Sequence, residues 1–259
     1  MADWDPRQYL RFEAERTQAG RDLVARIELA APARIVDLGC GPGNSTAVLR
    51  ARWPNAALVG IDRSPEMLRA ARSKYPDGTW IEADLRPPLA GAPYDLVFAN
   101  AALQWVPDHR SLVPALGRAT AEGGALAFQV PTRGDPPPPW LAAVRDLAAS
   151  PAWRGRLPPD DVADTVLGLT DYYDLLAPLA ERVDLWDTEY VHVFPGPEAI
   201  VEWTQGTGLR PVLDRLGTDA ARADFTAAYA RAIAAAYPRR PDGRVLFPFA
   251  RRFVVAYRR

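Results

Sequence analysis

A short glycine-rich segment that begins with an acidic residue has the composition of a turn whose backbone binds a ligand. It reads Asp37-Leu-Gly-Cys-Gly-Pro-Gly43 and comes at the end of an apolar run. Glycines let a ligand approach the backbone, and N–H groups at a helix start can receive its polar atoms. The spacing G-x-G-x-G differs from the dinucleotide pattern G-x-G-x-x-G. A carboxylate at Asp37 would repel a pyrophosphate and attract a cation, so the segment indicates a positively charged ligand.

Two further acids follow the next two apolar runs. Asp62 comes about twenty residues after the glycines, where an acid can accept both hydroxyls of a ribose. Asp84 ends the following run, where a carboxylate can accept from an adenine amino group. Taken singly, each acid is also explained as a helix cap or turn residue, and for Asp84 alone that reading is preferred. Together with Asp37, they outline one nucleoside ligand along a sheet edge.

Short apolar runs alternate with longer amphipathic ones between residues 34 and 130, which predicts a parallel sheet covered by helices. The predicted strands cover residues 34–38, 57–61, 79–82, 94–99 and 125–130, the last following Gly123-Gly124. A helix is predicted over residues 44–52, and another begins after Ser64 with Pro65 in its first turn. These elements bring the three acids to the carboxyl ends of three successive strands.

The second half of the chain has a different sequence pattern, with longer helical segments and fewer strands. Residues 140–180 and 197–237 are predicted to be mostly helical, and strands are predicted over 182–194 and 245–257, with a break allowed at Pro248. We expect a single domain over residues 1–259. Its parts are an N-terminal lid or helix (1–30), a cofactor-binding core (31–131), helical insertions that form a cap (132–181 and 195–243) and a closing strand (244–259).

Composition narrows the classes of function. The chain has 31 basic and 32 acidic residues, and a net charge of −1 supplies no general field for nucleic acid or an anionic membrane. One cysteine and two histidines offer no plausible zinc set, so no metal is expected. Cys40 is interpreted as a small residue in a tight loop rather than a nucleophile. His109 is expected at an exposed helix start.

No apolar stretch approaches the roughly 20 residues that a membrane-spanning helix requires. Residues 1–11 are polar and aromatic, unlike a basic segment followed by an apolar run, so no signal peptide is predicted. These features predict a cytoplasmic protein that acts on a small molecule, with no nucleic-acid or membrane partner. They leave the oligomeric state open.

The segment 37–43, with Asp62, Asp84 and Asn100, resembles the class I S-adenosylmethionine-dependent methyltransferases. Within that superfamily the chain is similar to the trans-aconitate methyltransferases nearly from end to end. The segments that carry this second likeness are Asp3-Trp-Asp-Pro6, Tyr9-Leu10, Arg52-Trp-Pro54, Ser64-Pro65, Glu82-Ala-Asp84, Phe98-Ala-Asn-Ala-Ala-Leu-Gln-Trp105, Tyr172-Tyr173, Thr207-Gly-Leu-Arg-Pro211 and Phe247-Pro-Phe249.

The resemblance implies an α/β fold, a Rossmann-like sheet of seven strands with the last one antiparallel, and S-adenosylmethionine as cofactor. The residues expected to bind the cofactor are Asp37, Gly39, Cys40, Gly41, Asn44, Asp62, Arg63, Met67, Asp84, Leu85 and Asn100. The implied reaction moves the sulfonium methyl to a carboxylate of trans-aconitate. A carboxylate with a pKa near 4 is already ionised at neutral pH, so no catalytic base is expected.

A tricarboxylate acceptor requires several positive or hydrogen-bonding groups. The candidates are Tyr9, Trp105, Gln129, Arg133, Tyr172, His192 and Arg252. Other readings remain open for several of them: core or lid packing for the two aromatic residues Tyr9 and Trp105, a half-buried strand histidine for His192, and an edge charge for Arg252. The loop after Gln129 departs from the family pattern, which has an asparagine-bearing turn there. Arg133 is the residue expected to replace it as a carboxylate ligand.

Alternatives remain open at this point. A methyltransferase of the same fold could act on another small acid or on a hydroxyl group of a natural product, which would require a base. A non-catalytic S-adenosylmethionine-binding protein would bind the cofactor and turn over no acceptor. A nicotinamide dehydrogenase is disfavoured by the glycine spacing and by Asp37.

Overall fold

The computed structural model describes residues 12–134, 136–157 and 165–259, which form two compact units. One, here the sheet unit, contains the described residues up to Thr132 with Thr165–Thr188 and Arg251–Arg259. The other, here the helical unit, contains Glu189–Ala250 and the described residues between 133 and 157. Tyr9 lies outside the described residues. None of the helices in the described part is long and apolar enough to cross a membrane.

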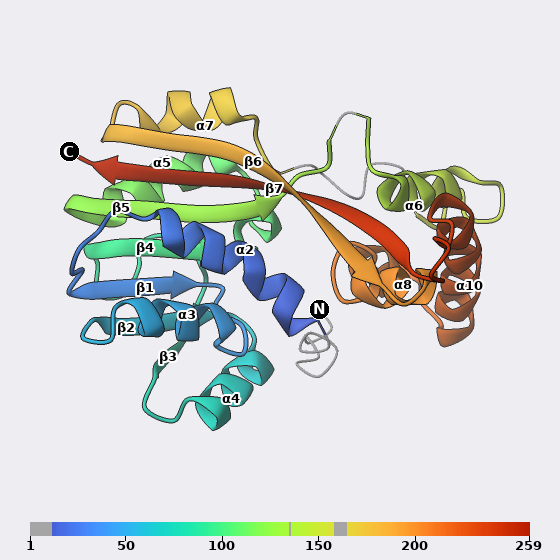
Figure 1. Ribbon diagram of the computed structural model, residues 1–259, viewed down its shortest axis with the longest axis horizontal. Helices are drawn as coiled ribbons and strands as arrows, with labels where there is room; N and C mark the ends of the chain where they lie inside the picture. Colours follow the sequence, from blue (N-terminus) through green and yellow to red (C-terminus); the bar gives the residue numbers. More distant parts are fainter. Residues whose placement is uncertain (1–11, 135, 158–164) are drawn as a thin grey trace. The chain divides into compact units, whose positions relative to one another are not determined.

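A mixed sheet with the strand order β3-β2-β1-β4-β5-β7-β6 organises the sheet unit (Figure 1). Its strands are β1 (Arg34–Leu38), β2 (Ala57–Asp62), β3 (Thr79–Glu82), β4 (Tyr94–Asn100), β5 (Thr120–Pro131), β6 (Ala180–Phe194) and β7 (Val245–Arg258). The first five strands pair in parallel, and β7 pairs antiparallel with β5. This confirms the predicted seven-stranded sheet with an antiparallel last strand.

Helices cover both faces of this sheet. Those of the sheet unit are α2 (Glu13–Arg26), α3 (Asn44–Arg52), α4 (Pro65–Lys74), the 3-10 turn η1 (Leu103–Trp105), α5 (His109–Ala119) and α7 (Leu169–Leu176). Helix α2 packs on α3 and β5, whereas α5 packs on α7, β4 and β5. In Figure 1, α2 and α3 lie in front of the strands and α5 lies behind them. The Ser64 side chain caps α4 by accepting from the Met67 N–H at 3.3 Å, as its sequence predicts.

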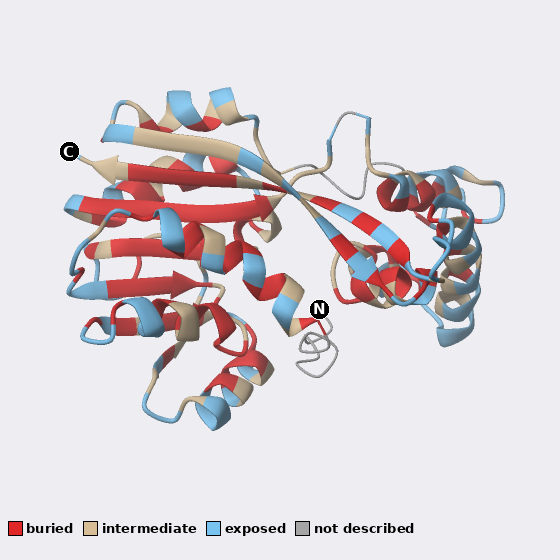
Figure 2. Cartoon of the chain, in the orientation of Figure 1, coloured by how far each residue is buried: buried red, intermediate tan, exposed pale blue. Residues whose placement is uncertain are grey.

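The core lies between the sheet and the α5–α7 layer. Val97 and Phe128 on the two central strands pack with Tyr172 on α7 and Val254 on β7, and all four are 0% exposed. Figure 2 shows the central strands buried along most of their length. Strands buried on both faces position the residues at their carboxyl ends rigidly.

The helical unit contains α6 (Pro139–Ala149), α8 (Pro197–Gln205), α9 (Arg210–Arg215) and α10 (Asp219–Ala236), and α10 packs on α6 and α8. Aromatic rings from β7 and α8 cluster around His192 on β6. Strand β7 does not break at Pro248. That proline is exposed and lies outside the segment that pairs with β5, so its missing N–H removes no bond from that ladder.

Candidate functional site

The glycine-rich turn joins β1 to α3. Gly39 and Gly41 have φ of +68° and +54°, a region that favours glycine. A Cβ at Gly39 would lie 2.3 Å from the Cβ of Ala102, so the turn packs against the segment that follows β4. A Cβ at Gly41 would meet nothing within 4 Å, and both glycines line a cavity. Bare backbone therefore faces space that a ligand can fill.

Asp37 is fully buried and does not line this cavity. One carboxylate oxygen accepts from Ser45 Oγ at 2.7 Å and from Thr46 Oγ1 at 2.6 Å. The other has no hydrogen-bond partner among the described residues. Burial raises the pKa of Asp37 to about 7, against the lowering effect of the two hydroxyls. A cation bound at the turn would favour the ionised form of this acid.

Asp62 ends β2 and lines the cavity. Its Oδ2 accepts from the Gly41 N–H and its Oδ1 from the Ser64 N–H, both at 2.9 Å. Burial raises the pKa of Asp62, and the two backbone N–H groups oppose that shift. The carboxylate thus fixes the glycine turn to the start of α4 and retains acceptor positions for a ligand.

Asp84 follows β3 on the cavity rim and is exposed. Arg86 holds it with two side-chain bonds, from Nε to Oδ1 at 2.8 Å and from Nη2 to Oδ2 at 2.7 Å. These bonds lower the pKa of Asp84 to about 2. Arg86 also lines the cavity and was not predicted, although its position two residues after the acid is a usable signal.

Asn100 ends β4 and is 9% exposed. Its Oδ1 accepts from Gln129 Nε2 at 2.6 Å, which ties the ends of β4 and β5 together. Helix α2 crosses here at Gly20, where a Cβ would lie 3.2 Å from the Asn100 Cγ. The next residue, Ala101, has a φ of +54°, a left-handed conformation that is costly for alanine.

These features surround one cavity of about 290 Å³ within the sheet unit. The structure brings together there the predicted residues Gly39, Gly41, Asp62, Arg63, Met67, Asp84, Leu85, Asn100 and Trp105. The lining residues that the sequence did not indicate are Arg86, Ala101, Ala102, Val106 and Pro107. The last four belong to the turn after β4, and their part in the cavity depends on how that turn folds.

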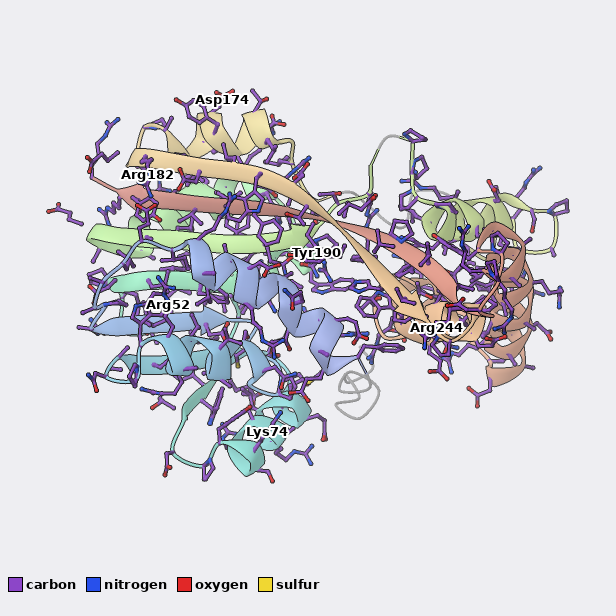
Figure 3. The ribbon with its side chains drawn as sticks, in the orientation of Figure 1. Arg52, Lys74, Asp174, Arg182, Tyr190 and Arg244 are labelled. Carbon is purple, nitrogen blue, oxygen red and sulfur yellow. The ribbon has the colours of Figure 1, made fainter. Side chains whose placement is uncertain are left out.

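Cys40 and Asn44 lie next to the cavity without lining it. Burial and neighbouring negative charge raise the pKa of the Cys40 thiol well above its usual value, so the thiol is neutral. Asn44 Oδ1 accepts from Lys74 Nζ at 3.3 Å, and the same ammonium contacts Glu13 Oε1 at 2.8 Å. Lys74, labelled in Figure 3, therefore joins α4 to the starts of α2 and α3.

Tyr172 points into the core and is 0% exposed. Its hydroxyl lies 2.6 Å from His109 Nδ1, and His109 Nε2 lies 2.8 Å from the Leu103 carbonyl oxygen. His109 does begin a helix, but the prediction that it is exposed is wrong, since it is 2% exposed. Its ring connects α5, α7 and the η1 turn, which contributes Trp105 to the cavity.

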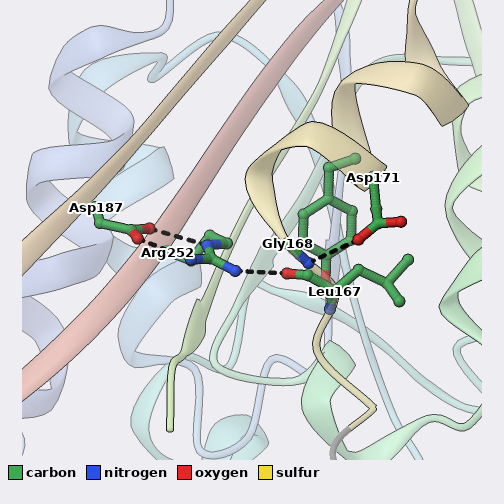
Figure 4. Close-up of polar contacts among 6 residues, drawn as sticks. Leu167, Gly168, Asp171, Asp187 and Arg252 are labelled. Carbon is green, nitrogen blue, oxygen red and sulfur yellow. Dashed lines mark hydrogen bonds and ion pairs between the residues drawn. The ribbon is translucent and has the colours of Figure 1, made fainter. Parts of the chain in front are cut away.

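Arg252 lies on the face of β7 that looks toward α7 (Figure 4). Its guanidinium makes two bonds to Asp187, at 3.0 and 2.8 Å, and one to the Leu167 carbonyl at 2.6 Å. Arg133 and His192 belong to the helical unit. The His192 ring packs 5.1 Å from the ring of Trp203, between centroids. None of these three predicted residues lines the cavity.

Comparisons with known proteins identify the family of this chain. A methyltransferase-domain family matches residues 36–128, from within β1 to most of β5. The trans-aconitate 2-methyltransferase of Azoarcus sp. is 50% identical over 259 residues, covering 100% of both chains. That of Methylobacterium nodulans is 49% identical over 259 residues, covering 100% of this chain and 99% of the relative.

Solved structures of lower identity show the fold. The YcgJ protein from Bacillus subtilis matches with a TM-score of 0.58 and 15% identity, over 93% of this chain and 98% of that one. Geranyl diphosphate C-methyltransferase from Streptomyces coelicolor matches with a TM-score of 0.53 and 12% identity, over 94% of this chain and 76% of that one.

Proposed function

Because the chain belongs to the trans-aconitate 2-methyltransferase family, we propose that it transfers a methyl group from S-adenosylmethionine to a carboxylate of trans-aconitate. The products are the monomethyl ester and S-adenosylhomocysteine. The observation that carries the proposal is identity of 49% to 50% over the whole chain, including the segments outside the methyltransferase domain.

The charges and hydrogen-bonding groups of the cavity support this cofactor. Asp62 retains acceptor positions for the ribose hydroxyls, and Asp84 on the rim can accept from the adenine amino group. Open space at Gly41 admits the amino acid end of the cofactor against bare backbone. The buried Asp37 lies beneath the same turn, where its negative charge favours a cation.

When bound, the cofactor supplies a methyl group on a sulfonium, and the acceptor oxygen takes it as the carbon–sulfur bond breaks and leaves its electron pair on sulfur. The cavity lining contains no histidine, cysteine, lysine or tyrosine among the described residues. Its carboxylates are Asp62, which fixes the glycine turn, and Asp84, which has a pKa of about 2 and is a poor base. An acceptor that is already ionised suits this lining.

The residues of the site therefore act by positioning. Holding nucleophile and methyl in line can supply up to roughly 7–11 kcal/mol in favourable systems. Sulfonium and carboxylate charges cancel as they react, so exclusion of water favours the step. The cavity wall near the end of β4 is lined by Gly39, Asn100 and Trp105.

The acceptor is a small acid in this proposal, and the net charge of −1 gives no reason to include nucleic acid. We place the reaction in the cytoplasm. The single cysteine is buried and cannot form an internal disulfide, the bond that an oxidising compartment would favour.

The test is methyl transfer from labelled S-adenosylmethionine to trans-aconitate, with cis-aconitate, citrate and isocitrate under identical conditions. We expect a strong preference for trans-aconitate and an ester product identified by mass spectrometry. With saturating cofactor, the rate should be flat from about pH 6 to 9, because the acceptor is ionised throughout. Cofactor binding without transfer to any of the four acids would refute the proposed acceptor.

A further inference from the structure

The side chain of Asn100 presents one particular end of its carboxamide to the cavity. Its Oδ1 accepts from Gln129 Nε2 at 2.6 Å, so this oxygen is already engaged. Its Nδ2 makes no hydrogen bond within the described part of the chain and stays accessible to solvent, although the residue is only 9% exposed. Because Asn100 lines the cavity, the group that remains for a ligand is the NH₂ donor.

Two neighbours hold this carboxamide. Gly20 on α2 faces its flat side, because a Cβ at Gly20 would lie 3.2 Å from Cγ, 3.2 Å from Oδ1 and 3.3 Å from Nδ2 of Asn100. This contact fixes the plane of the amide but does not distinguish its two ends, which have nearly the same shape. The bond from Gln129 makes that distinction, because an NH₂ group can only donate. Helix α2 thus sets the plane of the amide, and strand β5 sets which end faces the cavity.

Gln129 is placed to act through Asn100. It is 0% exposed and does not line the cavity, so the structure gives it an indirect role in place of the direct acceptor contact that the sequence suggests. The two residues are partners in the β4–β5 register, which puts their side chains on one face of the sheet. The Gln129 carbonyl oxygen also accepts from the Ala101 N–H at 3.0 Å. Backbone pairing therefore fixes the relative position of the two amides.

The strand order places Asn100 beside the reacting part of the cofactor. In the binding mode proposed above, the adenine lies at the end of β3, the ribose at the end of β2 and the amino acid end at the glycine turn after β1. Strand β4 is the next one in the sheet, about 4.8 Å further along. A donor at its end faces the side from which an acceptor can approach the methyl group. An NH₂ donor suits a carboxylate there and is unfavourable beside the positive groups of the cofactor.

We propose that Asn100 Nδ2 binds the carboxylate that accepts the methyl group, and that Gln129 is a positioning residue that keeps this donor turned toward the cavity. The proposal rests on the methylation of a carboxylate proposed above. One carboxylate oxygen attacks the methyl carbon, and the carbon–sulfur bond breaks with its electron pair left on sulfur. The other oxygen, held by Asn100, becomes the carbonyl oxygen of the ester, and no proton moves. This hydrogen bond weakens as the carboxylate loses its charge, so Asn100 contributes mostly to binding and orienting the acceptor.

The Asn100→Asp variant tests the polarity of the group that faces the cavity. It keeps the shape of the side chain and an acceptor for Gln129, but it offers a negative oxygen in place of the NH₂ group. We expect kcat/KM for trans-aconitate at pH 8 to fall at least about 30-fold, mostly through KM. Calorimetric binding of S-adenosylmethionine should stay unchanged or tighten, whereas a folding defect would weaken both ligands. Weaker cofactor binding with an unchanged KM for trans-aconitate would assign Asn100 to the cofactor and overturn the proposal.

A double-mutant cycle tests whether Gln129 acts through Asn100. Gln129→Met keeps the length of the side chain and removes the donor, so Asn100 can turn over. We expect kcat/KM for trans-aconitate to fall about 3- to 10-fold. Asn100→Ala should lower it about 10- to 100-fold, and adding Gln129→Met to that variant should change it less than about twofold. Equal losses from Gln129→Met in both backgrounds would show a purely structural role and overturn the positioning role.

Gln18→Met is the matched control, because Gln18 Nε2 donates to Asp22 Oδ1 at 2.9 Å on the exposed side of α2. It should leave kcat/KM unchanged. If the unchanged enzyme transfers no methyl group to trans-aconitate, the proposed function fails. Calorimetric binding of trans-aconitate to the S-adenosylhomocysteine complex then decides the acceptor contact separately. A Kd at least about tenfold higher in Asn100→Ala would support it, and an unchanged Kd, or no binding to the unchanged enzyme, would overturn it.

Discussion

Replacing Asp62 with asparagine tests whether this carboxylate binds the ribose of the cofactor. The two carboxylate oxygens already accept from the N–H groups of Gly41 and Ser64, both at 2.9 Å. An ionised carboxylate has about four acceptor positions, so two remain for a diol. Asparagine turns one oxygen into a donor, and at least one hydroxyl loses a charge-assisted bond worth about 1.5–3 kcal/mol. We expect the Kd of S-adenosylhomocysteine to rise by about 10- to 150-fold.

The assay for this variant is isothermal titration calorimetry with S-adenosylhomocysteine, which binds without turnover. Asp84→Asn is the control, because that carboxylate is exposed and already held by Arg86, so its loss should change the Kd less than about fivefold. Thermal unfolding without ligand checks that the Asp62 variant folds. An unchanged Kd for the Asp62 variant, or equal changes for both variants, would remove Asp62 from the ribose site.

Three further outcomes are expected. The pKa of Asp37, raised to about 7, means that the folded protein binds this proton more tightly than the unfolded chain, so ionisation of Asp37 opposes folding increasingly as pH rises from about 4 to 7. A cationic ligand favours the ionised form, so calorimetry should show S-adenosylmethionine binding more tightly at pH 8 than at pH 6, with a smaller change in Asp37→Asn. Gly39→Ala should lower cofactor affinity at least about tenfold in the same assay, because its Cβ would lie 2.3 Å from that of Ala102 at a φ of +68°. His109→Phe should lower the free energy of unfolding in urea by about 2–4 kcal/mol, since it removes two buried hydrogen bonds, one with the Tyr172 hydroxyl and one with the Leu103 carbonyl oxygen.

Most of the sheet was predictable because its signals are local. The strands β1 and β3 begin and end at the predicted residues, and Ser64 caps α4 as expected. The start of β5 was predicted too late, at Ala125, because the strand was expected to follow Gly123-Gly124. The strand runs through this pair from Thr120, and a Cβ at Gly124 would lie 2.6 Å from the Asp95 carbonyl oxygen. The glycines let β5 approach β4 closely where the register of the two strands shifts, and they do not reverse the chain.

The site was predictable only in part, for the same reason. Asp62 and Asp84 are found from strand ends, because parallel strands bring their carboxyl ends to one edge. His109 contacts Tyr172, which is 63 residues away in the sequence, and no local sequence pattern predicts such a contact. The face of β7 on which Arg252 lies depends on a register between strands that are far apart in sequence, and a shift of one residue exchanges the two faces.

Buried charge in this protein is arranged for a reaction that cancels charge. Asp37 and Asp62 have raised pKa values, so their ionised forms gain most when a cation arrives. A sulfonium beside these acids would be attracted to them. Its reaction with a carboxylate removes one positive and one negative charge, so the energetic demand on the protein is to bring the pair together without water, and no proton needs to move.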